Sequence, residues 1–300
     1  LAVQEVDFTG GEPLLRPDWW RIADRVAENG ITTRIVTNGL PLTPATVARI
    51  RDVGISTVGI SLDGLEATHD DIRGYPGLWR RVLAGIQRTL EAGVAVGVIT
   101  AVNAKNLGEL PALLALLQSI GVTHWQLQPN LPRGRSGESP DLHLSDRQFL
   151  ELGSFFRTEQ PKAAEKGFTI VPADSLGYFT GLDLLDPPWR GCHAGLFTVG
   201  ITSDGKVKGC LTMPDDMIEG DLRRNDLWEI WFREGARRSC FSMAAARASP
   251  RGPRRGWRRS ATPTSRSSRT AARAGAGRAA SFSAASTCPP RRSASSSSTT

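Results

Sequence analysis

Apolar positions recur along this chain at two different spacings. Short runs rich in β-branched residues occur at 5–9, 33–37, 57–61, 95–100 and 123–128, and such runs are typical of buried strands. Between them apolar residues recur every three or four positions, as in Val47, Ile50 and Val53, which is typical of amphipathic helices. Strands that alternate with helices predict right-handed βαβ units around a parallel sheet. The fold class we expect is therefore α/β, with a partial TIM-like (β/α) barrel favoured over an open sheet.

The predicted helices end at recurring glycines. Gly30, Gly54, Gly93 and Gly121 each precede Ile or Val and then a predicted strand. Glycine readily adopts the left-handed conformation that ends a helix, so these positions mark helix-to-strand junctions. One further helix is predicted from about Ser145 and is expected to break or end near 161, because proline cannot continue the hydrogen-bond ladder.

Polar residues follow the predicted strands at 9–12, 37–39, 61–64, 103 and 126–130. In parallel α/β folds ligands bind at the carboxyl ends of strands, so these segments predict one binding face. Gly10 and Gly11 can bring backbone groups close to a ligand, and Glu12 adds a carboxylate suited to an ammonium group. A plain strand-to-helix turn is the alternative for this segment.

The charge is divided unevenly. Of 37 basic residues, 14 lie after residue 236, whereas none of the 30 acidic residues does, so the body carries −7 and the tail +14. The Arg-, Ser- and Ala-rich composition at 236–300 predicts disorder. No apolar run is long enough for a membrane span, and we expect a soluble cytoplasmic protein without a membrane partner.

The polar segments together resemble the motifs of the radical S-adenosylmethionine (radical SAM) enzymes. The segment 10–13 is similar to their GGEP motif, 37–39 to TNG, and 61–74 to the SLDG…HD…RG run. The resemblance implies that a 4Fe-4S cluster cleaves S-adenosylmethionine to a 5′-deoxyadenosyl radical, which abstracts hydrogen from a substrate. It also implies a set of cofactor-binding residues: Gly10, Gly11, Glu12, Pro13, Thr37, Asn38, Ser61, Asp63 and Gln128.

A second resemblance begins after residue 186, where a hairpin is predicted around the Asp-Gly pair at 204–205. The spacing of Cys192, Gly205 and Cys210 is similar to the opening of the SPASM domain, which holds auxiliary iron-sulfur clusters. The resemblance implies that both cysteines are metal ligands of a possible auxiliary 4Fe-4S cluster. Two unpaired thiols, or half of a zinc site, are the alternatives.

Two departures from these families are evident. The chain has no CxxxCxxC triplet for the radical cluster, and its remaining cysteines, Cys240 and Cys288, do not have SPASM spacing. We therefore expect a barrel at 1–185 that lacks its first strand and cluster loop, a truncated SPASM-type domain at 186–235, and an out-of-frame tail at 236–300. The shift in reading frame is predicted between Arg233 and Met243. A chain of this kind should have no turnover by itself.

The resemblance implies peptide or protein side-chain maturation, with a peptide or protein substrate and an electron donor such as ferredoxin or flavodoxin. No nucleic-acid partner is expected. Two other interpretations are compatible with the residues alone: a cluster-free TIM-barrel lyase or isomerase, and a non-catalytic basic protein that binds nucleic acid through the arginine tail.

Overall fold

The structure, a computed structural model, describes residues 2–130, 139–173, 175–176 and 193–232. The chain divides into two compact units, whose described parts are 2–193 and 194–232. The predictions for Cys192, for Cys240 and Cys288 and for the tail at 236–300 concern positions outside the described residues.

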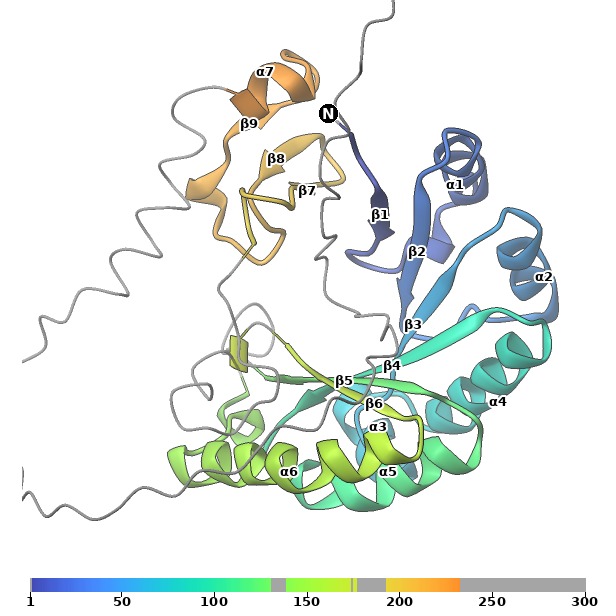
Figure 1. The fold of residues 1–300 in the computed structure, drawn as a ribbon, viewed down its shortest axis with the longest axis vertical. Helices are drawn as coiled ribbons and strands as arrows, with labels where there is room; N and C mark the ends of the chain where they lie inside the picture. Colours follow the sequence, from blue (N-terminus) through green and yellow to red (C-terminus); the bar gives the residue numbers. More distant parts are fainter. Residues whose placement is uncertain (1, 131–138, 174, 177–192, 233–300) are drawn as a thin grey trace, which may run out of the picture. The chain divides into compact units, whose positions relative to one another are not determined.

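The first unit is built on six parallel strands that pair in chain order. Helices connect successive strands and lie on the outer side of the curved sheet (Figure 1). This arrangement confirms the α/β partial-barrel prediction. Its elements are β1 (Glu5–Phe8), η1 (Pro13–Leu15), α1 (Trp19–Glu28), β2 (Thr32–Thr37), α2 (Pro44–Asp52), β3 (Thr57–Ser61), α3 (Glu66–Arg73), α4 (Leu78–Glu91), β4 (Ala95–Val102), η2 (Leu107–Glu109), α5 (Leu110–Ser119), β5 (His124–Pro129), η4 (Pro140–Leu142), α6 (Asp146–Glu165) and β6 (Thr169–Pro172).

The two faces of the sheet have different compositions. Ile35, Ile60 and Trp125 lie in the apolar core between the strands and the helices, and each is almost wholly buried. Side chains alternate along a strand, so the residues next to each of these core residues in its strand point to the opposite, concave face of the sheet. That face carries Glu5, Asp7, Arg34, Ser61, Gln126 and Gln128.

The helix ends follow the sequence prediction. The glycines at 30, 54, 93 and 121 all have positive φ angles between 72° and 84°. The Thr43 hydroxyl accepts a hydrogen bond from the backbone N–H of Thr46, and Pro44 is the first residue of α2. Ser145 forms a capping box with Gln148 at the start of α6.

The predicted break at Pro161 is wrong. Helix α6 continues through Pro161 to Glu165. The lost backbone bond falls in the last turns of a 20-residue helix, where the buried side chains of Leu152, Phe156 and Ala163 hold the helix against the core. Packing therefore outweighs the local preference of proline.

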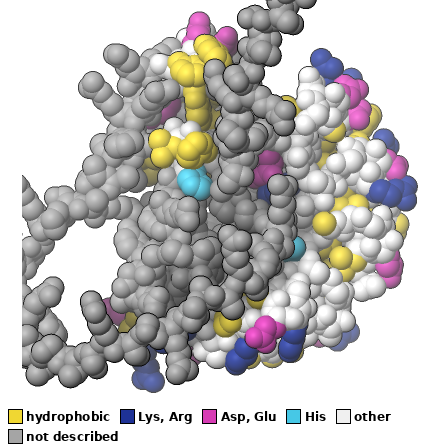
Figure 2. Space-filling model, in the orientation of Figure 1, with side chains coloured by type: hydrophobic (Ala, Val, Ile, Leu, Met, Phe, Trp, Pro, Cys, Tyr) yellow, Lys and Arg dark blue, Asp and Glu magenta, His cyan; other side chains and the backbone are white. Residues whose placement is uncertain are grey.

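The second unit contains a small antiparallel sheet of β7 (Gly200–Ile201), β8 (Lys206–Lys208) and β9 (Gly220–Asp221), together with η6 (Asp215–Met217) and α7 (Leu227–Phe232). The β7–β8 hairpin confirms the turn predicted at Asp204-Gly205, and Gly205 has a φ of 83°. Several large hydrophobic side chains are exposed on this unit (Figure 2): Leu196, Phe197, Ile201, Leu211, Ile218, Trp228 and Phe232.

In the part of the chain that the structure describes, no helix is both long enough and apolar enough to cross a membrane.

Candidate functional site

The loop after β1 presents its backbone to open space. Gly10 has a φ of 118°, a conformation that side-chain-bearing residues rarely adopt, and Gly11 beside it is also exposed. A Cβ atom at either position would meet no other atom within 4 Å. Neither glycine takes part in a hydrogen bond with the described residues. Backbone groups at 10–11 are therefore available to a ligand.

Glu12 joins this loop to the next one. Its Oε1 atom accepts hydrogen bonds from the Thr37 hydroxyl at 2.8 Å and from the Leu14 N–H at 3.2 Å, and its Oε2 atom accepts the Asn38 N–H at 2.7 Å. Pro13 is the first residue of η1, and Leu14 is buried. Most of the acceptor capacity of the Glu12 carboxylate is thus used to connect the ends of β1 and β2.

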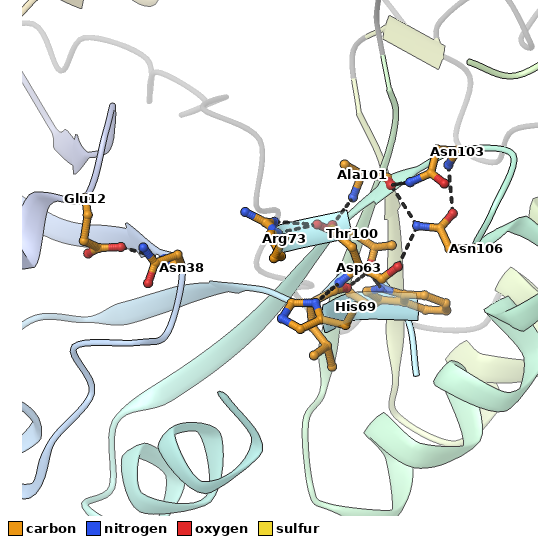
Figure 3. Close-up of polar contacts among 11 residues, drawn as sticks. Glu12, Asn38, Asp63, His69, Arg73, Thr100, Ala101, Asn103 and Asn106 are labelled. Carbon is orange, nitrogen blue, oxygen red and sulfur yellow. Dashed lines mark hydrogen bonds and ion pairs between the residues drawn. The ribbon is translucent and has the colours of Figure 1, made fainter. Parts of the chain in front are cut away.

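Thr37 and Asn38 form the second part of this connection. The buried Thr37 hydroxyl also accepts the Gly39 N–H at 3.1 Å, and the Asn38 Oδ1 atom accepts the Leu40 N–H at 2.8 Å. These side chains fix the turn after β2, and Asn38 lies close to Glu12 in Figure 3.

Ser61 and Asp63 have contrasting surroundings. Ser61 ends β3 on the concave face, is half-buried and forms no side-chain hydrogen bond with the described residues. Asp63 is only 2% exposed. Its Oδ2 atom accepts a hydrogen bond from Arg73 Nε at 2.6 Å and lies 2.6 Å from Arg73 Nη2 in an ion pair, and its Oδ1 atom accepts a hydrogen bond from the Ala101 N–H at 2.9 Å. Ser61 can therefore contact a ligand directly, whereas Asp63 is engaged by the protein.

The Asp63 backbone completes a cluster of hydrogen-bonded residues, called the hub, which consists of Asp63, His69, Arg73, Ala101 and Asn106. Its N–H donates to His69 Nδ1 at 3.0 Å, and its carbonyl accepts the Asn106 side-chain amide at 2.7 Å (Figure 3). These contacts tie the end of β3 to α3 and to the segment after β4. Among the hub residues, only Asp63 was predicted from the sequence as a site residue. Arg73 and His69 lie in the motif that it quoted, and Asn106 carried no motif signal.

His69 is a fully buried member of this hub. Because Nδ1 accepts a hydrogen bond, the neutral imidazole carries its proton on Nε2, which has no hydrogen-bond partner among the described residues. Burial lowers the pKa of His69 below its ordinary value, although the charge of Asp63 opposes this effect.

His69 should therefore contribute a loss of stability as the pH falls below about 6.5, the ordinary histidine pKa. In that range the unfolded chain binds a proton at His69 and the folded chain does not. The stability that neutral His69 gives the folded state is therefore fully present above the unfolded-state pKa, and it is lost as the pH falls toward the lower folded-state pKa. Urea unfolding at about pH 7.5 and about pH 5.5 measures the loss. His69→Asn, which keeps an acceptor without titrating, should reduce the loss. An equal acid-induced loss in the unaltered protein and in His69→Asn would contradict the prediction.

Charged side chains of β1 and β2 also lie on the concave face. Arg34 and Glu5 form an ion pair with 2.5 Å between Nη2 and Oε2. Desolvation raises the pKa of Glu5 and of Asp7, and Arg34 partly offsets both effects. Gln128 lies farther along, near the end of β5, where it is exposed and aligned with Ala101 of β4. The concave face thus combines charged groups with neutral amides.

Cys210 lies in the second unit, in a turn anchored by a buried lysine. Its thiol is half-buried and 3.2 Å from the Thr212 hydroxyl. Lys208, only 5% exposed, donates to the Met213 carbonyl at 3.1 Å and to the Asp215 carboxylate. The described residues contain no group of three or more His, Cys, Asp or Glu side chains that could hold a metal ion. Cys210 is therefore at most one member of a larger ligand set.

A curved parallel sheet with free ligand-binding groups at its carboxyl edge defines a TIM-like α/β protein. Sequence comparison gives two domain matches: the radical SAM superfamily over residues 1–117 and the SPASM iron-sulfur cluster-binding domain over residues 192–254. The chain is 30% identical to an AdoMet-dependent heme synthase of Methanosarcina barkeri over 243 residues, covering 75% of this chain and 67% of the relative. The chain belongs to the radical SAM superfamily.

Other relatives have different names. A pre-heme d1 synthase of Dinoroseobacter shibae is 34% identical over 77% of this chain and 62% of its own length. The mycofactocin maturase MftC of Mycobacterium tuberculosis is 27% identical over 74% of this chain and 56% of its own length. The chain spans 61–67% of the length of the three AdoMet-dependent heme synthases that it matches.

Solved structures confirm the fold. Streptococcus suis SuiB bound to S-adenosylmethionine has a TM-score of 0.66 at 16% identity, covering 78% of this chain and 56% of that one. The enzyme anSMEcpe with bound AdoMet has a TM-score of 0.62 at 15% identity, covering 79% of this chain and 65% of that one.

The two families imply S-adenosylmethionine and 4Fe-4S clusters as cofactors. The site fits S-adenosylmethionine, because the backbone at Gly10 and Gly11 is open and the Ser61 hydroxyl is uncommitted. The described residues do not fit a cluster, because they bring together no adequate ligand set and the sequence has no CxxxCxxC triplet.

Proposed function

We propose that this chain forms the S-adenosylmethionine-binding barrel of a radical SAM enzyme. The observation that carries the proposal is the open Gly10–Gly11 backbone, which Glu12 fastens to the turn after β2. S-adenosylmethionine held at Gly10 and Gly11 would supply the 5′-deoxyadenosyl group for hydrogen abstraction, whereas this chain does not supply the CxxxCxxC ligands of the cluster that cleaves it. Family membership favours this interpretation over a cluster-free barrel enzyme or a basic nucleic-acid-binding protein.

The residues of the site divide into two groups in this proposal. Gly10 and Gly11 hold the methionine end of the cofactor through backbone groups, and Ser61 and Gln128 contact its polar groups from β3 and β5. A second group keeps the first in place by joining neighbouring loops: Glu12, Pro13, Thr37, Asn38 and Asp63. From the SPASM match, Cys192 and Cys210 would be ligands of an auxiliary cluster, as the sequence predicts.

Two substrate classes are supported. Relatives named as heme and pre-heme d1 synthases favour a tetrapyrrole, a macrocycle with carboxylate side chains. The mycofactocin maturase and the structure of SuiB with its precursor peptide SuiA favour the peptide substrate expected from the sequence. Three tetrapyrrole synthases are 30–34% identical to the chain and two are 26–27% identical, against 27–29% for the mycofactocin maturases, and we place the tetrapyrrole first on the three higher values. A cytoplasmic location and a ferredoxin or flavodoxin as electron donor complete the proposal.

The test uses a polypeptide that carries these residues together with a CxxxCxxC segment, reconstituted with iron and sulfide without oxygen. We expect an absorbance band at about 400 nm from the iron-sulfur cluster, and release of 5′-deoxyadenosine from S-adenosylmethionine. The present chain, which lacks the triplet, should release none. Gly10→Ala should reduce the release about tenfold or more, and Gly30→Ala, also at positive φ but at the end of α1, should not. A reconstituted polypeptide with neither absorbance nor cleavage would refute the proposal.

A further inference from the structure

Asp7 is an accessible carboxylate on the concave face of the sheet. It lies in β1 between Val6 and Phe8, and Phe8 packs against the core, so the Asp7 side chain points to the opposite face. The residue is exposed to solvent. Within the part of the chain that the structure describes, its carboxylate has no hydrogen bond and no ion pair. Asp7 is therefore a charged group on the ligand-binding side that can accept an external partner.

The basic side chain opposite Asp7 is paired with a different carboxylate. Arg34 is the residue of β2 that lies directly across from Asp7 in the parallel pairing. Its Nη2 atom nevertheless pairs with the Oε2 atom of Glu5, 2.5 Å away, and these two side chains are 20% and 23% exposed. Arg34 attracts Asp7 electrostatically without forming an ion pair with it. The Glu5–Arg34 pair thus leaves Asp7 available to another cation.

The charges of the strands do not balance. Histidine aside, the six strands contain three charged side chains, those of Glu5, Asp7 and Arg34, and their sum is −1. The surrounding protein also makes the charged form of Asp7 costly, since desolvation raises the pKa of this carboxyl. A cation beside Asp7 would offset that cost, whereas an anion would increase it. The concave face therefore favours a positively charged ligand group.

Asp7 also lies within reach of the backbone that is open to the cofactor. Gly10 follows Asp7 by three positions, so their Cα atoms are at most about 11 Å apart. A substrate held at Asp7 by one end can therefore extend a bond several atoms away toward the open backbone at Gly10 and Gly11. A long cationic side chain with its attached peptide backbone has this shape.

We propose that Asp7 is a specificity-determining residue that binds an ammonium or guanidinium group of a peptide substrate. The proposal rests on the proposed function and selects the peptide from its two substrate classes, because a face of net negative charge repels the carboxylates of a tetrapyrrole. Identity to the relatives and the charge of this face thus rank the two classes differently. Binding measurements without a loaded cluster decide between them.

The first arm titrates the full chain, with and without S-adenosylhomocysteine, with acetyl-Gly-Gly-Lys-Gly-Gly-amide and with the same peptide carrying norleucine in place of lysine. The unaltered chain should bind the lysine peptide about tenfold more tightly, because only the ammonium group can form a charge-assisted hydrogen bond. Asp7→Asn should abolish this preference, and Asp7→Glu should retain most of it. The matched control is Asp24→Asn, which removes an exposed carboxylate from α1 on the outer side of the sheet (Figure 1).

The second arm uses coproporphyrin III, whose side chains end in carboxylates. Asp7→Asn should tighten its binding severalfold, since the substitution removes a like charge. Thermal unfolding confirms that each variant is folded. A lysine preference that is absent from the unaltered chain, or that survives in folded Asp7→Asn, overturns the inference, and so does weaker binding of coproporphyrin III to Asp7→Asn. If the unaltered chain binds no S-adenosylhomocysteine, the proposed function fails, and the lysine preference measured without that ligand still tests the role of Asp7.

Discussion

Asp63→Ala should lower the free energy of unfolding by about 3 kcal/mol, within the range found when one partner of a buried ion pair is removed. The substitution leaves the Ala101 N–H without its acceptor and Arg73 without its partner. Asp63 is almost fully buried, so little water can replace the lost contacts. Because Arg73 is partly exposed, it regains some hydration, and this keeps the loss below the largest values of that range.

Urea unfolding of Asp63→Ala and of Asp52→Ala compares the loss of a carboxylate from a buried ion pair with its loss from an exposed one. Asp52 also pairs with an arginine, Arg51, at 2.7 Å, but the two side chains are 59% and 57% exposed. An exposed pair of this kind contributes about 0–1 kcal/mol, so Asp52→Ala should have little effect. Similar losses in the two variants would show that Asp63 does not organise the hub.

The sheet was predictable because its signals are local. Each predicted strand lies within a few residues of an observed one, since a β-branched run bounded by glycine has few alternatives in an α/β chain. Helix α6 was less predictable. The burial of Leu152, Phe156 and Ala163 depends on residues distant in sequence, and that packing keeps the helix intact at Pro161.

The shared edge of the candidate site residues was also predictable, but the orientation of their side chains was not. Parallel topology brings the segments after β1, β2 and β3 to one edge, so Glu12, Asn38 and Ser61 share a region of the fold. The sequence does not reveal that Asp63 turns inward to Arg73 and Ala101, because these contacts depend on the placement of α3 and β4. A motif therefore predicts which segments meet at one edge of the sheet, without separating the residues that could touch a ligand from those that hold them in place.

Gly39→Ala should be destabilising by about 3 kcal/mol, and Gly54→Ala by about 1 kcal/mol. Both glycines have positive φ angles, 83° and 72°, so each substitution carries the cost of a left-handed alanine. A Cβ atom at Gly39 would lie 3.0 Å from Val82 Cγ2 and 3.2 Å from Ile60 Cγ2, whereas at Gly54 it would meet nothing within 4 Å. Val82 and Ile60 are fully buried and β-branched, so neither can move aside easily.

The same pair of variants tests whether the turn after β2 supports ligand binding. Gly39 follows Asn38, whose N–H donates to Glu12 Oε2 at 2.7 Å, so a shift at Gly39 is transmitted to the loop that carries Gly10 and Gly11. Gly39→Ala should therefore weaken S-adenosylhomocysteine binding severalfold at a temperature where the protein is still folded, and Gly54→Ala should leave it unchanged. Urea unfolding and ligand titration on both variants give the two results. Equal destabilisation would refute the packing argument, and unchanged affinity in folded Gly39→Ala would show that the loops after β1 and β2 are not coupled through Glu12.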